Sequence, residues 1–285
     1  MQIQPPWLEP PQAGKNFTVP EVDNVPDLHG DIVSPQLVVF FNGNQFMVVR
    51  DLIQAFKQQY PQYERIYVQT LPPGILAQQI EQGALVIGNL RIAHQADIYT
   101  AGEVRIRRLD EHKGWFTRSQ AYTRNRLALM VHAENPARVT TLSDLARGEV
   151  RISMPNPEFE GIGKRVEQAY EKAGGMQLVN EIMQEKVKQG STFLTRIHHR
   201  QTPMRILQGK SDVGPVWRTE VLFQQRIGNP IGMLEIPEAF NQTATYVAAQ
   251  LKAAPHPQAA SEFLDFLISE QGQGIYRRYG FLPVD

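Results

Sequence analysis

The sequence contains no cysteine among its 285 residues. This absence excludes thiol nucleophiles, disulfide bonds, zinc–thiolate sites and iron–sulfur clusters. The cellular compartment stays open, because a chain without thiols folds equally well in oxidising and reducing surroundings.

The sequence also lacks an excess of charge and a long apolar run. Lysine and arginine total 29, as do aspartate and glutamate. A nucleic-acid-binding protein normally carries a basic excess, so we expect no nucleic-acid partner. No apolar run approaches the roughly 18 residues of a membrane span. The start, MQIQPPWLEPPQAGKNFTVP, lacks the basic and apolar regions of a secretory signal, so we expect either a cytoplasmic protein or a mature exported form.

The common catalytic motifs are missing as well. There is no phosphate-binding loop ending in Gly-Lys-Ser/Thr, no His-Glu-x-x-His pair and no Gly-x-Ser-x-Gly elbow. Gly161-Ile162-Gly163 lacks the third glycine of a dinucleotide-binding loop. An enzyme remains possible on these grounds, but no motif indicates a particular one.

What the sequence does contain is a repeated strand–turn–helix pattern after a proline-rich arm, residues 1–35. Residues 37–41 (LVVFF) form a continuous apolar run, typical of a parallel strand covered on both faces. Such alternation predicts α/β sheets with right-handed crossovers. Thr202-Pro203 predicts a helix with Thr202 as its N-cap. The predicted strands are 37–41, 65–69, 96–100, 127–131, 150–154, 212–216 and 245–251.

Four polar turns follow predicted strands. In open α/β sheets, ligands bind beyond the carboxyl ends of strands, near the free N–H groups of helix N-termini. Two of the turns lie before residue 127 and two after it, so a site shared by two lobes would use both pairs. The four turns are Asn42-Gly43-Asn44, Thr70–Gly74, Pro155–Gly163 and His198–Thr202.

Several segments resemble one family, the periplasmic molybdate-binding proteins. Residues 122–157 (YTRNRLALMVHAENPARVTTLSDLARGEVRISMPNP) resemble its interdomain crossing, with an Arg-Asn strand, an Asn-Pro loop and a Leu-x-Asp-Leu helix. Residues 79–84 (QIEQGA), 211–220 (SDVGPVWRTE) and 245–284 fit the same pattern. The resemblance covers about residues 37–284, with an apparent insertion around 85–95.

The resemblance implies a two-lobed type II periplasmic-binding-protein fold. Each lobe would be a mostly parallel sheet flanked by helices, and two crossing strands would join the lobes. Lobe 1 would hold residues 36–126 and 245–285, and lobe 2 residues 127–244. The family binds a small solute in the cleft between the lobes, without chemistry, and passes it to the permease of an ABC-type uptake transporter. The resemblance therefore implies no enzyme, no catalytic residue and no cofactor. We therefore expect a periplasmic or otherwise extracytoplasmic protein that is a monomer.

Four contact segments depart from the family's usual residues: the first three of the four turns and the aromatic at 217. The first turn offers Asn42 and Asn44 instead of serine, and Pro72 and Pro73 remove backbone donors from the second. The third turn carries Glu158 and Glu160, and two carboxylates are unfavourable near an oxyanion. Trp217 stands where the family usually has tyrosine. The candidate solute-binding residues are Asn42, Gly43, Asn44, Thr70, Gly74, Glu160, Gly161, His199, Arg200 and Trp217.

Three kinds of solute fit these residues. An oxyanion such as molybdate or tungstate would be held by Arg200, the two asparagine amides and a histidine N–H. An organic solute would stack on Trp217. A divalent metal or metal chelate would be bound by Glu158, Glu160, His198 and His199, although adjacent histidines in an extended segment point to opposite sides.

Apart from these solute-binding roles, a regulator effector domain or an enzyme on the same fold is a further alternative.

Overall fold

The computed structural model describes residues 27–87, 90–158, 160–195 and 198–284. They divide into two compact units. We call Pro26–Asn125 with Ala244–Asp285 lobe 1, and Arg126–Thr243 lobe 2. The chain passes between the units inside strand β7 (Phe116–His132) and at the start of strand β12 (Thr243–Leu251). Within the described residues, no helix is long and apolar enough to cross a membrane.

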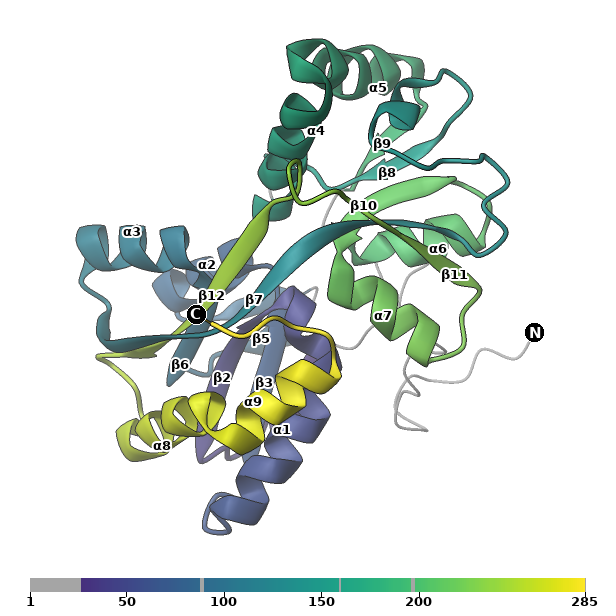
Figure 1. The fold of residues 1–285 in the computed structure, drawn as a ribbon. Helices are drawn as coiled ribbons and strands as arrows, with labels where there is room; N and C mark the ends of the chain where they lie inside the picture. Colours follow the sequence, from purple (N-terminus) through teal and green to yellow (C-terminus); the bar gives the residue numbers. More distant parts are fainter. Residues whose placement is uncertain (1–26, 88–89, 159, 196–197, 285) are drawn as a thin grey trace. The chain divides into compact units, whose positions relative to one another are not determined.

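Lobe 1 is built on a mixed sheet (Figure 1). Its parallel centre has the order β3 (Ile66–Leu71), β2 (Leu37–Asn42) and β6 (Ile98–Gly102). Antiparallel strands flank this centre, β1 (Leu28–Gly30) beside β3 and β12 beside β6. All six residues of β2 are buried, so the apolar run at 37–41 is the doubly covered strand that its composition predicts.

Helices cover both faces of the lobe 1 sheet (Figure 1). Helices α2 (Pro73–Gln82) and α3 (Glu103–Lys113) bury Leu76 and Ile106 against Phe40 and its neighbours on one face. On the other face lie α1 (Phe46–Gln59), α8 (Pro257–Ile268) and α9 (Glu270–Arg278). There Phe263 of α8 packs edge-on against Phe41 and Phe56. Because successive strand side chains point to opposite faces, Phe40 and Phe41 supply one aromatic to each layer.

Lobe 2 has its own mixed sheet. Strand β7 pairs antiparallel with β10 (Val213–Trp217) and with β11 (Ile231–Glu235). Strand β8 (Ile152–Met154) runs parallel to both β10 and β9 (Thr192–Leu194). The carboxyl ends of β8, β9 and β10 therefore meet at one edge of this sheet.

The connections of lobe 2 are helical. Helix α4 (Gly161–Asn180) follows β8, and a π turn (Glu181–Glu185) and α5 (Lys186–Gln189) lead on to β9. A 3-10 turn (His199–Gln201) and α6 (Thr202–Leu207) connect β9 to β10, after which comes α7 (Arg218–Arg226). An apolar core joins α6 and α7 to the sheet through Ala128, Met130, Ile206, Val216, Val221 and Ile231.

Several sequence-based expectations about local structure are wrong in detail. The strand predicted at 127–131 is the end of the longer strand β7, because backbone pairing continues through the polar residues before it. Thr202 is the first residue of α6 rather than its cap, and its hydroxyl lies 2.9 Å from that of Ser153. The insertion around 85–95 contains a hairpin of β4 (Leu85–Ile87) and β5 (Leu90–Ile92). Of the predicted N-terminal arm, residues 1–26 lie outside the described residues, whereas 28–30 pair with β3 as an edge strand.

Candidate functional site

A group of polar side chains gathers at the edge of lobe 2 where β8, β9 and β10 end. Glu160 lies after β8 and immediately before α4, and His198 and His199 lie after β9. Glu220 lies in the first turn of α7, directly after β10. We call these four residues the histidine cluster. Each is at least nine-tenths buried, although each carries a titratable group.

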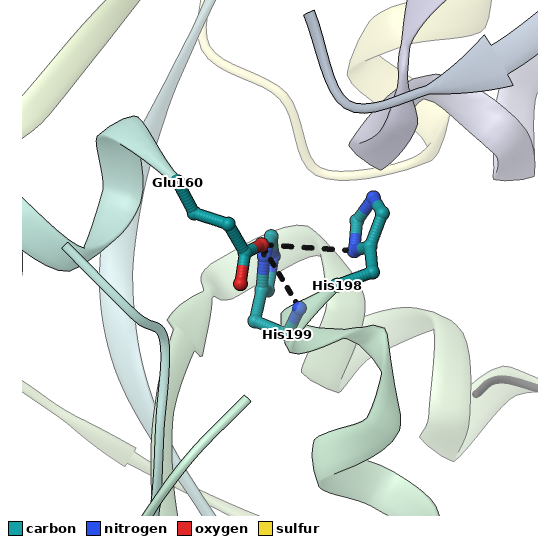
Figure 2. A group of neighbouring side chains, drawn as sticks. All are labelled: Glu160, His198 and His199. Carbon is teal, nitrogen blue, oxygen red and sulfur yellow. Dashed lines mark hydrogen bonds and ion pairs between the residues drawn. The ribbon is translucent and has the colours of Figure 1, made fainter. Parts of the chain in front are cut away.

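His199 is held between two carboxylates. Its Nδ1 lies 2.5 Å from Glu160 Oε2, and its Nε2 lies 2.9 Å from Glu220 Oε2. Its backbone N–H also donates to Glu160 Oε2 at 2.9 Å, as Figure 2 shows for the Glu160 side of this arrangement. Burial alone would lower the pKa of His199, but the charges and hydrogen bonds of Glu220 and Glu160 outweigh it and raise the pKa to about 10. His199 is therefore an imidazolium at neutral pH, with both ring N–H groups in use.

The two carboxylates have further donors in lobe 2. The Thr195 hydroxyl donates to Glu160 Oε1 at 2.7 Å, and the Trp217 backbone N–H donates to Glu220 Oε2 at 3.0 Å. The second contact caps α7, since Glu220 is its third residue and reaches back to the residue that precedes the helix. Glu220 Oε1 is buried without a hydrogen-bond partner among the described residues.

His198 has the opposite protonation state. The Arg200 backbone N–H donates to its Nδ1 at 3.2 Å, whereas Glu160 Oε2 is 3.8 Å from the same nitrogen. The contact with the Arg200 N–H is the shorter of the two, and it makes Nδ1 a hydrogen-bond acceptor. Burial, and then the positive charges of Arg200 and His199, hold the pKa of His198 well below its usual value. His198 is therefore a neutral imidazole that carries its proton on Nε2.

Lobe 1 contains a second polar group, at the carboxyl end of β2. The Thr100 hydroxyl donates to Asn42 Oδ1 at 2.7 Å, and Asn42 Nδ2 donates to Asn44 Oδ1 at 2.5 Å. Asn44 Nδ2 then donates to the Tyr246 hydroxyl, also at 2.5 Å. All four side chains are buried, at 4% exposure or less. We call this the asparagine chain.

The remaining predicted site residues are spread over both lobes. In lobe 1, Gly43 is buried beside the asparagine chain, and Thr70 Oγ1 lies 3.1 Å from His29 Nε2 of β1. Gly74 lies in the first turn of α2, and a Cβ there would meet nothing within 4 Å. In lobe 2, Arg200 and Trp217 are buried, at 4% and 5% exposure.

Part of the lobe 2 site differs from what the sequence predicts. Glu158 is exposed and is not among the residues that come together with the histidines. The expectation that adjacent histidines point to opposite sides is wrong, because His199 begins a 3-10 turn instead of continuing an extended segment. The two rings lie 4.9 Å apart, at an angle of 35°.

Four contributing residues were missed altogether: Glu220 and Thr195 in lobe 2, and Thr100 and Tyr246 in lobe 1. Only Glu220 had a usable signal, since a glutamate three residues after a strand-ending residue has the spacing of a helix cap.

The turn that carries Glu160 depends on a close backbone approach at Gly163. A Cβ at Gly163 would lie 2.5 Å from Pro157 N and 2.6 Å from Pro155 O, whereas a Cβ at Gly161 would meet nothing within 4 Å. We expect Gly163→Ala to lower the free energy of unfolding by about 1–3 kcal/mol, because the turn must shift. Gly161→Ala, the matched control, should change it by less than about 0.5 kcal/mol. Urea unfolding measures both, and equal stability of the two variants would contradict this account of the turn.

A family of known proteins and a relative with the same role match this chain. Residues 37–282 match the family described as bacterial extracellular solute-binding protein. An ABC transporter substrate-binding lipoprotein of Bacillus subtilis (strain 168), YvgL, whose own assignment is provisional, is 26% identical over 210 residues, covering 73% of this chain and 72% of the relative.

Solved structures share the fold at low identity. The periplasmic molybdate-binding protein of Azotobacter vinelandii has a TM-score of 0.70 at 15% identity, with coverage of 87% of this chain and all of the other. Iron-bound HitA of Pseudomonas aeruginosa has a TM-score of 0.64 at 16% identity, with coverage of 87% and 85%. These likenesses confirm the predicted two-lobed periplasmic-binding-protein fold, and their different solutes show that the fold alone does not select one.

Proteins of this kind act outside the cytoplasm, where they bind a small ligand and deliver it to a membrane permease without altering it. The chain belongs to the bacterial extracellular solute-binding proteins, and it is the substrate-binding component of an ABC transporter.

Proposed function

We propose that the solute is a small oxyanion, of the class that includes molybdate and tungstate. The observation that carries this proposal is the position of His199 between Glu160 and Glu220. A pair of buried carboxylates is the feature that would attract a metal cation, but here a protonated side chain already lies between them. One positive charge of the protein thereby offsets one of the two carboxylate charges and occupies the place between them that a metal cation would take.

The divalent-metal hypothesis ranks second, and one observation favours it. Glu160, His198 and His199 each offer a ligand atom, and these atoms lie within 4.8 Å of one another. Metal ligation requires neutral imidazoles, so a metal would have to displace the proton of His199. It would also have to displace the Arg200 N–H from His198 Nδ1 if it used that nitrogen. Each requirement weakens metal binding at neutral pH.

Hydrogen-bond donors suited to an oxyanion are present in both lobes. Arg200 brings a permanent positive charge into the 3-10 turn next to the histidine cluster. In lobe 1, the primary amides of Asn42 and Asn44 each have two N–H groups, and the asparagine chain uses one of each. Buried donors of this kind favour an acceptor-rich solute.

Thermal unfolding with a panel of solutes tests the proposal. The protein is first unfolded and refolded to remove any bound solute, and then melted with molybdate, tungstate, sulfate, phosphate, zinc or manganese. A solute at one hundred times its Kd stabilises the folded state by about 2.7 kcal/mol, so the melting temperature should rise with at least one oxyanion. Zinc and manganese should not raise the melting temperature in a way that EDTA reverses. A rise with metals alone would support the second hypothesis, and no rise with any oxyanion would contradict the first.

A further inference from the structure

His198 is a buried residue whose imidazole forms a hydrogen bond to the described residues through one of its two nitrogens. Its Nδ1 accepts the Arg200 backbone N–H and so caps the 3-10 turn. The residue is 4% exposed, and its ring lies against that of His199. Figure 2 shows the other nitrogen, Nε2, on the side of the ring that faces away from Glu160. Among the described residues, none forms a hydrogen bond with Nε2.

The cap fixes what this second nitrogen can do. Because Nδ1 accepts a hydrogen bond, the proton of a neutral ring lies on Nε2, which is then a donor only. A cap requires a side-chain acceptor two residues before the N–H, and serine, asparagine or aspartate would supply one with fewer atoms. Among the described residues, the Nε2–H group therefore has no part in the local fold.

We infer that His198 is a specificity-determining residue, whose Nε2–H donates to an oxygen of the solute that carries no proton. This inference rests on the proposed function and makes it more specific. A ring whose only acceptor is occupied by the Arg200 N–H offers no acceptor for the proton of a solute hydroxyl, which would be left without a hydrogen bond here. A solute that presents bare oxygens is accordingly preferred over one that presents a hydroxyl at this position.

Two substitutions separate the cap from the donor. His198→Asn keeps an acceptor close to the Nδ1 position, so the turn stays capped, but its short side chain cannot reach the Nε2 position. His198→Gln places an amide N–H near the Nε2 position but loses the cap geometry. A purely structural role of His198 predicts that the asparagine variant behaves like the natural protein and that the glutamine variant is impaired. A solute-binding role predicts the opposite order for affinity.

The experiment is calorimetric titration of the refolded protein and both variants with sodium molybdate and sodium sulfate, with urea unfolding of each variant as a check on folding. We expect the affinity of His198→Asn for the oxyanion that binds to fall at least about tenfold, at unchanged stability, because a buried donor to an anion is lost. His198→Gln should stay within about threefold in affinity, while its stability falls. Natural affinity in the asparagine variant would overturn the role of His198 and leave the oxyanion proposal standing. Failure of the natural protein to bind either oxyanion would overturn both.

Discussion

Replacing His199 with alanine is expected to lower the free energy of unfolding by about 3–5 kcal/mol at neutral pH. The reason is the pair of carboxylates that the imidazolium separates. Without the imidazolium, the carboxylates of Glu160 and Glu220 would lose their shared counter-charge at buried positions, with 6% and 5% side-chain exposure. Removing one partner of a buried ion pair costs far more than removing an exposed one. Urea unfolding at pH 7 measures the loss.

A double variant shows whether the loss comes from uncompensated charge. In His199→Ala with Glu220→Gln, one of the two charges is gone, while the glutamine oxygen can still accept the Trp217 N–H that caps α7. We expect the double variant to be more stable than His199→Ala alone, although it carries one more substitution. A double variant that is less stable than the single one would show instead that the loss comes from the cavity left by the ring.

Much of the fold follows from features that the sequence displays locally. The LVVFF run predicts a strand buried on both faces, and β2 is buried along its whole length. The turn after β2 and the two turns that enclose the histidine cluster lie at strand ends, as an alternating strand–helix pattern requires. These features depend on near neighbours in the chain, so composition and spacing suffice to predict them.

The internal order of the histidine cluster depends on residues far apart in the sequence. Glu160 lies 39 residues from His199, and Glu220 lies 21 residues from it. No local sequence pattern predicts that both carboxylates contact the His199 ring, one at each nitrogen. From residue types alone, Glu160 and His199 are predicted to bind the solute, with a metal site that also includes Glu158 and His198 as the alternative. Residue types do not indicate which ring lies between the carboxylates. Spacing places Glu160 and the two histidines in turns that follow strands, whereas the distances show that Glu160 and Glu220 contact the two nitrogens of one ring.

The two adjacent histidines should give the protein a stability maximum near pH 6.5. In the unfolded chain, both titrate near their usual pKa. His199 has a raised pKa in the folded state, so between pH 6.5 and about 10 the folded state holds a proton that the unfolded state has lost. Stability from His199 is therefore fully present below pH 6.5 and falls as the pH rises through this window. The full window corresponds to a loss on the order of 5 kcal/mol.

His198 acts in the opposite direction on the acid side. The pKa of His198 is lowered in the folded state. Below pH 6.5 the unfolded state therefore binds a proton that the folded state does not bind. Stability from His198 is present above pH 6.5 and falls as the pH decreases, at a slope of up to about 1.4 kcal/mol per pH unit. Carboxylates with lowered pKa values, such as Asp144 with a pKa of about 2, add their losses only below about pH 4.

Urea unfolding at intervals between pH 4.5 and pH 9.5 measures both slopes. Above pH 9.5 the tyrosines with raised pKa values begin to contribute, because their unfolded counterparts ionise near pH 10. His199→Gln should remove the alkaline slope, and His198→Asn should remove the acid slope while the alkaline one remains. Each variant then serves as the control for the other, because the residues are adjacent and buried alike but have pKa values shifted in opposite directions. An alkaline slope that persists in His199→Gln would show that the proton between Glu160 and Glu220 is not on this ring.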